Sequence, residues 1–270
     1  MKKNIILIYL IGIITICTTS SCKDVIDVDL RTADPQLVID GSIRMGEFAE
    51  VLITKTKEFS GSNEYTPVTD AVVTITTGQN SEILQCNEEG RYVATTIIGT
   101  ERTTYHLSVW YEDVEYTSTS YMPPRVEIDE LTIWKMPIRD IADPQVHFKD
   151  PIGEENQYYR FVLYINGVKP TLRDRLEDRL MSTEFVDGSN ISQPIFISYQ
   201  TDRDDDPIEK GDLVTVEMQC IDKGVYKFFE TLYNVEDALA NPTSNIKGGA
   251  LGYFGAYSYT SADLVMEWED

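Results

Sequence analysis

The chain has 270 residues and is strongly acidic, with 45 Asp and Glu residues against 23 Lys and Arg residues and a formal net charge of −22. This charge repels nucleic-acid phosphates and anionic lipid headgroups, and no basic cluster offsets it locally, so we expect no nucleic-acid partner. Sixteen tyrosines exclude a disordered acidic tail as the origin of the charge. The composition therefore indicates a folded protein with a solvated acidic surface.

The N-terminus is typical of an exported lipoprotein. Lys2 and Lys3 precede an apolar run from Ile5 to Ile16, and small or hydroxyl residues lead to Cys22. The run is shorter than the ~20 residues that a membrane-spanning helix needs. We expect residues 1–21 to be a lipoprotein signal peptide and Cys22 to carry the lipid; the alternative is an ordinary thiol behind a cleavage site a few residues away. Removal of residues 1–21 takes away two lysines and leaves a net charge of −24.

Residues 22–34 are predicted to form a short lipidated tether. Acyl chains contribute ~0.8 kcal/mol per buried CH2, so two or three chains anchor a protein durably. Cys22 followed by Lys23 and Asp24 resembles the export tags with which Bacteroidota send lipoproteins across the outer membrane. The resemblance implies an outer-membrane protein, lipid-anchored and exposed at the cell surface.

Residues 35–122 are predicted to form an antiparallel β-sandwich. Apolar residues alternate with polar ones in short runs rich in Val, Ile, Thr and Tyr, and glycine-containing turns separate the runs. The predicted strands contain Leu37 and Ile39; Val51 and Ile53; Ala71, Val73 and Ile75; Ile83 and Leu84; Tyr92 and Ala94; Tyr105, Leu107 and Val109; and Tyr116.

Three stretches of this half, residues 67–75, 87–92 and 104–109, resemble the transthyretin-like, carboxypeptidase-regulatory type of Ig-like domain. In that type, a strand with alternating apolar residues precedes a turn that ends in Gly-x-Tyr, here Gly90 to Tyr92. The glycine has a physical explanation, because a tight turn between adjacent strands needs a residue that tolerates positive φ.

Pro123 and Pro124 mark a domain boundary, because proline cannot donate a hydrogen bond to a sheet. Residues 125–270 are predicted to form a second antiparallel β-sandwich with one amphipathic C-terminal helix, so the fold class is mainly β with two Ig-like sandwich domains. Strands are expected around 128–133, 145–150, 158–166, 195–199 and 214–220, and a short surface helix over 173–181.

Residues 222–240 are predicted to form an amphipathic helix that ends at Asn241 and Pro242. Apolar residues fall on one stripe, which we interpret as packing against the second sandwich and not as a cofactor site. The stripe consists of Val225, Phe228, Phe229, Leu232, Val235 and Leu239.

A glycine-rich segment, residues 241–258, follows the helix. It is no phosphate cradle, because such loops follow a strand and open a helix. We expect its glycines to allow close backbone approach, and its exposed part to be a partner or ligand surface. The candidate surface residues are Asn245, Gly248, Gly249, Gly252, Tyr253 and Phe254.

This segment, with Phe148–Pro151 and Asn156–Arg160, resembles the signature of a Bacteroidota outer-membrane lipoprotein family known as a domain of unknown function. The resemblance spans nearly the whole mature chain. Members are often encoded beside TonB-dependent outer-membrane receptors, which implies such a receptor as a partner.

The residues that carry catalysis or bind metals are scarce. His106 and His147 each lie in a predicted strand without a catalytic motif, so we expect no enzyme and no cofactor. Cys86 and Cys220 are expected to be separate buried thiols, with a disulfide as the alternative. Asp202, Asp204 and Asp206 form a weak Ca²⁺ candidate, but the spacing does not fit an EF-hand, and a solvated acidic loop is the preferred interpretation.

Two function hypotheses remain from the sequence. The first is a non-catalytic accessory subunit of a TonB-dependent nutrient uptake system. The second is a glycan-binding or adhesion lipoprotein that stacks sugars on Trp110, Trp134 or Trp268. The second requires exposed tryptophans, whereas we expect tryptophans in a sandwich to be largely buried.

Overall fold

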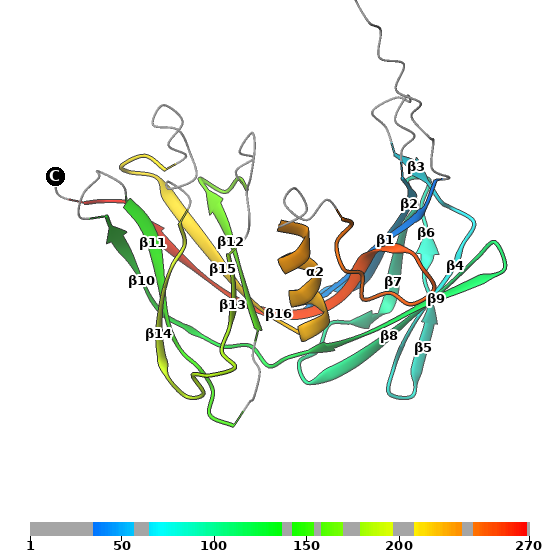
Figure 1. The fold of residues 1–270 in the computed structure, drawn as a ribbon, viewed down its shortest axis with the longest axis horizontal. Coiled ribbons are helices and arrows are strands. Elements are labelled where there is room, and N and C mark those ends of the chain that lie inside the picture. Colours follow the sequence, from blue (N-terminus) through cyan, green and yellow to red (C-terminus); the bar gives the residue numbers. More distant parts are fainter. Residues whose placement is uncertain are drawn as a thin grey trace, which may run out of the picture. The chain divides into compact units, whose positions relative to one another are not determined.

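The structure, a computed structural model, describes residues 35–56, 65–136, 142–153, 158–169, 179–196, 208–233 and 240–268 (Figure 1). The predicted signal peptide, Cys22, the tether and the acidic loop with Asp202, Asp204 and Asp206 lie outside these residues. Within the described ranges, no helix has the length and apolarity needed to cross a membrane.

The first sandwich is made of two sheets. One contains β1 (Leu37–Arg44), β2 (Phe48–Lys55), β3 (Thr66–Pro67), β6 (Gln85–Cys86) and β7 (Arg91–Ile98). The other has the order β5-β4-β8-β9, with β4 (Val72–Thr77), β5 (Asn80–Ile83), β8 (Thr103–Tyr111) and β9 (Val114–Met122). The alternation of apolar and polar residues explains why the two sheets pack face to face. Every second residue of these strands points inward and is buried between the sheets. The core includes Ile39, Ile53, Val73, Ile75 and Tyr105.

The turn that resembles transthyretin-like domains is as expected. Gly90 has a φ of 76°, and a Cβ at this position would lie 2.7 Å from the carbonyl oxygen of Ile53. Tyr92 is buried and donates its hydroxyl to the carbonyl of Val68 at 3.0 Å. The glycine therefore serves both the turn and a close backbone contact.

The second sandwich also has two layers. A three-stranded sheet has the order β10-β11-β14, with β10 (Ile128–Lys135), β11 (Ala142–Lys149) and β14 (Asn190–Pro194). The facing layer has the order β13-β12-β15-β16, with β12 (Tyr158–Ile165), β13 (Arg179–Ser182), β15 (Leu213–Ile221) and β16 (Leu251–Val265). Its core contains Phe148, Tyr159, Phe161, Val216 and Met218. The prediction of a mainly β protein with sandwich architecture is confirmed.

Strand β16 takes part in both sandwiches (Figure 1). Residues 251–257 pair with β1 in parallel, and residues 258–265 pair with β15 in antiparallel orientation. One continuous sheet, β13-β12-β15-β16-β1-β2-β7-β6, thus runs through both halves. The parallel β1–β16 pair departs from the purely antiparallel prediction, because β16 reaches β1 from the far end of the sequence and not through a hairpin.

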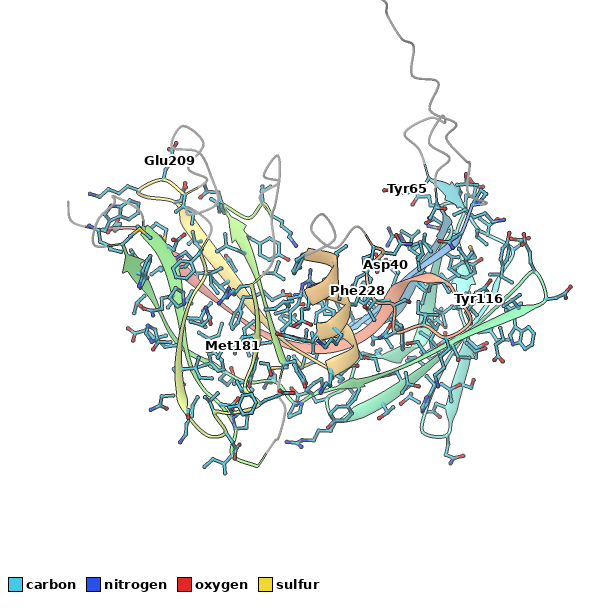
Figure 2. The ribbon with its side chains drawn as sticks, in the orientation of Figure 1. Asp40, Tyr65, Tyr116, Met181, Glu209 and Phe228 are labelled. Carbon is cyan, nitrogen blue, oxygen red and sulfur yellow. The ribbon has the colours of Figure 1, made fainter. Side chains whose placement is uncertain are left out.

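Helix α2 (Lys223–Tyr233) packs on this continuous sheet. Val225, Phe228 and Phe229 are buried as predicted, but Leu232 is 38% exposed. Phe228, which is labelled on the helix in Figure 2, stacks on Tyr253 of β16. The two ring centroids lie 4.6 Å apart. The rest of the predicted stripe, Val235 and Leu239, lies outside the described residues.

Two local predictions in the second half are wrong. The helix predicted over 173–181 does not include its last residues, because Arg179–Ser182 form strand β13, paired with β12. The strand predicted over 195–199 lies earlier, at Asn190–Pro194, where Ile191 pairs with Phe148. The last contact with β11 comes just after Pro194, where the N–H of Ile195 donates to the carbonyl of Pro144 at 2.9 Å. Residues 173–178 and 197–199 lie outside the described ranges.

Candidate functional site

The glycine-rich segment is a structural joint. Gly252 has a φ of 90°, and a Cβ there would lie 2.1 Å from the carbonyl oxygen of Ile39 on β1. A Cβ on Gly248 would lie 2.8 Å from the carbonyl oxygen of Glu115 at the start of β9. The prediction of close backbone approach is confirmed at these two positions. Gly249 differs, because it is exposed and a Cβ there would have no described atom within 4 Å.

Asn245 holds the segment to β16 through its side chain. Its amide nitrogen donates to the carbonyl of Phe254 at 2.7 Å, and its amide oxygen accepts from the backbone N–H of Phe254 at 2.9 Å. The side chain therefore acts as a strand partner for one residue. Phe254 itself is fully buried in the first core. The prediction that Phe254 belongs to a partner surface is wrong, because its ring has no exposed area to offer.

A second set of hydrogen bonds joins β9, β16 and the start of α2. Ser120 donates its hydroxyl to the carboxylate of Asp222 and accepts the backbone N–H of Ala256 at 2.8 Å. Asp222 also accepts from the N–H of Tyr121 at 3.1 Å and from the N–H of Val225 at 2.9 Å. Burial raises the pKa of this carboxyl above its ordinary value and outweighs these hydrogen bonds, which act in the opposite direction. Asp222 thus caps the helix and attaches it to the first sandwich.

The two stretches that carry the family resemblance, Phe148–Pro151 and Asn156–Arg160, contain described residues with structural roles. Asp150 is buried and accepts the hydroxyl of Tyr159 at 3.0 Å and the backbone N–H of Gly188 at 3.3 Å. The guanidinium of Arg160 lies 3.9 Å from the ring centre of Phe229 on α2. These residues therefore hold the second sandwich and its helix together.

The two histidines lie apart and are used in strand-to-strand hydrogen bonds. His106 Nδ1 lies 2.9 Å from Thr119 Oγ1, and His147 lies 2.7 Å from Thr132 Oγ1 and 2.8 Å from Ser192 Oγ. Among the described residues, no three His, Cys, Asp or Glu side chains gather in a way that could hold a metal ion.

The cysteines are separate thiols and form no disulfide with each other. Cys220 is buried, and burial raises its pKa to about 12, so this thiol is unreactive at neutral pH. Cys86 is exposed, which corrects the prediction that both thiols are buried. The reason is its place in β6, a two-residue strand at the edge of the sheet.

The tryptophans differ in exposure. Trp110 is 50% exposed, so the expectation of a largely buried ring is wrong there. Trp134 is half-buried and makes an edge contact with Phe196, with ring centroids 4.9 Å apart. Trp268 is half-buried, and the ammonium group of Lys210 lies 5.9 Å from its ring centre.

Trp110 lies on the outer face of the sheet β5-β4-β8-β9. In the register of that sheet, Trp110 stands between Val72 and Glu115, and the neighbouring row contains Ile83, Thr74 and Ser108. Val72 is 48% and Ile83 is 66% exposed. The sequence predicted the strand but not this exposed face, because the alternation gives two faces without saying whether another element covers the outer one.

A polar pocket opens at one end of the first sandwich, between the β4–β5 turn and the β7–β8 turn. Its volume is about 740 Å³. Hydroxyl and amide side chains and two isoleucines line it, and no charged side chain of the described residues does so. The lining residues are Thr77, Gln79, Asn80, Ser81, Thr96, Ile97, Ile98, Thr100, Thr103 and Tyr105.

Glu82 holds one wall of this pocket in place. In the pairing of β2 with β7, Glu50 stands opposite Val93 and Phe48 opposite Ile98, so residues 94–97 bulge out of the ladder. The carboxylate of Glu82 accepts the backbone N–H groups of Thr95 at 2.6 Å, Thr96 at 3.0 Å and Ile97 at 2.9 Å. It also accepts the hydroxyls of Thr95 and Thr96.

These contacts define the protonation state of Glu82. Burial raises its pKa, but the five hydrogen bonds outweigh burial and lower the pKa to about 2. No sequence pattern indicates a structural role for Glu82. It is a glutamate in a short polar strand, and its hydrogen-bond partners lie more than ten positions away.

No protein of curated function matches the chain significantly. A family model described as "Domain of unknown function (DUF4249)" matches residues 23–263. The match includes both sandwiches, the helix and the glycine-rich joint, and the chain therefore belongs to this family of unknown function.

Proposed function

We propose that the protein is a non-catalytic, lipid-anchored surface protein that acts as an accessory subunit of a TonB-dependent nutrient uptake system. The lipid anchor is inferred from the N-terminal pattern of two lysines, an apolar run and Cys22. The Cys22-Lys23-Asp24 resemblance supports the cell surface of a Bacteroidota outer membrane. The resemblance of the whole chain to lipoproteins encoded beside TonB-dependent receptors supports the partner.

The side chains of the described residues support a binding role over catalysis. His106 lies within hydrogen-bond distance of the hydroxyl of Thr119 on the neighbouring strand. His147 lies between the hydroxyls of Thr132 and Ser192, so its two ring nitrogens join three strands. The carboxylates of Glu82, Asp150 and Asp222 accept hydrogen bonds from backbone N–H groups and from hydroxyl groups of the protein itself. These carboxylate oxygens are engaged by groups of the protein itself, which disfavours a role in general acid–base catalysis.

The test is purification of the tagged protein from membranes in mild detergent, beside a Cys22→Ala variant. A TonB-dependent receptor recovered in stoichiometric amount with the lipidated protein alone is the expected result. A lipidated protein that is recovered without a partner would contradict the transporter role. Metabolic labelling with a radioactive fatty acid, which Cys22→Ala should abolish, tests the anchor separately.

A second candidate function, glycan binding at the cell surface, is favoured by the exposure of Trp110. An indole ring that is half exposed beside the exposed Val72 offers an apolar face to a sugar ring. The transthyretin-like, Ig-like character of residues 35–122 is compatible with both functions and stays a prediction.

A further inference from the structure

We propose that the polar pocket at the end of the first sandwich, between the β4–β5 and β7–β8 turns, binds a neutral saccharide. This inference deepens the glycan-binding candidate by naming a site other than Trp110, and it does not depend on the transporter partner. Its volume of about 740 Å³ lies within the range of small-molecule sites.

The lining matches the hydrogen-bonding pattern of a sugar. A sugar hydroxyl both donates and accepts, and so do the Gln79 and Asn80 amides that line the pocket. The lining hydroxyls of Thr96, Thr100 and Thr103 donate to other groups of the protein and offer their oxygens as acceptors. Gln79 and Asn80 are exposed, and their side chains make no hydrogen bond within the part of the chain that the structure describes. Ile98 is 44% exposed and offers an apolar surface to the C–H face of a sugar ring.

The electrostatics favour a neutral ligand. An anion would meet the field of a chain with a net charge of −22, and no described basic side chain lines the pocket to offset that field. A cation would need a carboxylate. The nearby Glu82 carboxylate is already engaged by Thr95, Thr96 and Ile97, so it is not directed at a ligand.

The same contacts disfavour an extended peptide. Peptides that bind along a sheet use free backbone donors at an edge. Here the backbone N–H groups of the bulge in β7 donate to Glu82. The phenol of Tyr105 is likewise engaged, because it donates to the carbonyl of Ile98 at 3.1 Å and accepts the N–H of Thr100 at 2.7 Å.

The pocket lies near the opposite end of β1 from the start of that strand. The chain enters the first sandwich at Leu37, which pairs with Lys55 at one end of β1. The lining residues Ile98 and Thr100 flank Gly99, which pairs with Met45 at the other end of β1. Eight residues of strand separate these ends by about 26 Å. These lining residues therefore lie at the opposite end of β1 from its first residue.

The experiment is calorimetric titration of the purified full-length lipoprotein, in a detergent without a sugar headgroup, with neutral hexasaccharides of glucose, xylose and mannose. The probes for other ligand classes are oligogalacturonate and a neutral Gly-Ser-Asn peptide. We expect binding of at least one neutral hexasaccharide. The Gln79→Ala/Asn80→Ala double variant should weaken it about tenfold or more, since it removes both unengaged amides.

The matched control is Gln85→Ala/Asn190→Ala, which removes one glutamine and one asparagine from exposed positions elsewhere and should bind as the wild type does. Thermal unfolding of each variant verifies that it is folded. Absence of binding to all three hexasaccharides, binding of the anion or the peptide instead, or saccharide binding that Trp110→Ala abolishes and the pocket variant leaves unchanged would each overturn the proposal. The pocket variant should still co-purify a receptor, so failure of this proposal is distinguishable from failure of the transporter role.

Discussion

The glycine-rich joint, residues 245–254, and the polar pocket differ in how visible they are in the sequence and in how exposed they are in the fold. The joint has an unusual composition, yet its last residue, Phe254, is fully buried. The pocket consists of ordinary threonine, asparagine and glutamine residues, yet it presents its side chains to solvent. The glycine-rich motif therefore marks a place where the backbone is closely packed. The proposed saccharide pocket, in contrast, is formed by residue types that do not stand out in the sequence.

Gly252 should be the position of the joint at which a substitution costs the most stability. Gly252→Ala would place a Cβ 2.1 Å from a backbone oxygen and would require a φ of 90°, so we expect a loss of at least about 4 kcal/mol in the free energy of unfolding or failure to fold. Urea unfolding followed by circular dichroism measures it. Gly249→Ala is the matched control: it has a similar φ of 93° without the clash, and it should cost only about 1 kcal/mol. Equal losses in the two variants would show that close approach is not the cause.

The aromatic residues Phe254 and Trp110 differ in burial, and their substitutions should differ in cost for that reason. Phe254→Ala should destabilise the protein by about 3 to 5 kcal/mol, because it leaves a cavity in the first core. Trp110→Ala should cost no more than about 1 kcal/mol, since half of its side chain is already in water. Unfolding midpoints in urea for the two variants give the comparison. A larger loss for Trp110→Ala would mean that the outer face of β8 is covered in the folded protein.

Glu82 should show the smallest effect, and one that depends on pH. The folded pKa of about 2 lies below the ordinary value of 4.5, so the carboxylate stabilises the fold fully above pH 4.5, and this contribution is lost as the pH falls towards 2. Because the carboxylate is only partly buried and solvent screens it, we expect Glu82→Gln to cost only about 1 kcal/mol at pH 7. Urea unfolding at pH 7, 4 and 3 should show the difference from wild type shrinking. A difference that is constant with pH would argue against the charged carboxylate as the stabilising group.

Much of the fold follows from local pattern. The alternation of apolar residues placed Ile39, Ile53, Val73 and Tyr105 in one core, because a strand has a period of two residues. The helix stripe placed Val225, Phe228 and Phe229 against the sheet for the equivalent reason at a period of 3.6. The turn at Gly90 followed from the need for positive φ.

Other features required the tertiary structure. The sequence predicted that the glycines of residues 248–252 allow close approach, but it could not say that the contacts are with Ile39 and Glu115, roughly 210 and 130 positions away. The same limit hid the parallel pairing of β16 with β1 and the role of Glu82 on the bulge of β7. These depend on which distant strands become neighbours.

The sequence by itself determined the class of fold, the main strands of the first half and the helix, because each follows from the period or size of residues close together in the chain. The lipoprotein pattern at the N-terminus stays a prediction. The tertiary structure alone decided that Phe254 is buried, that Trp110 is exposed and that hydroxyl and amide groups from two distant turns share a pocket. The physical reason is that burial depends on what covers a face, and the covering residues come from elsewhere in the chain.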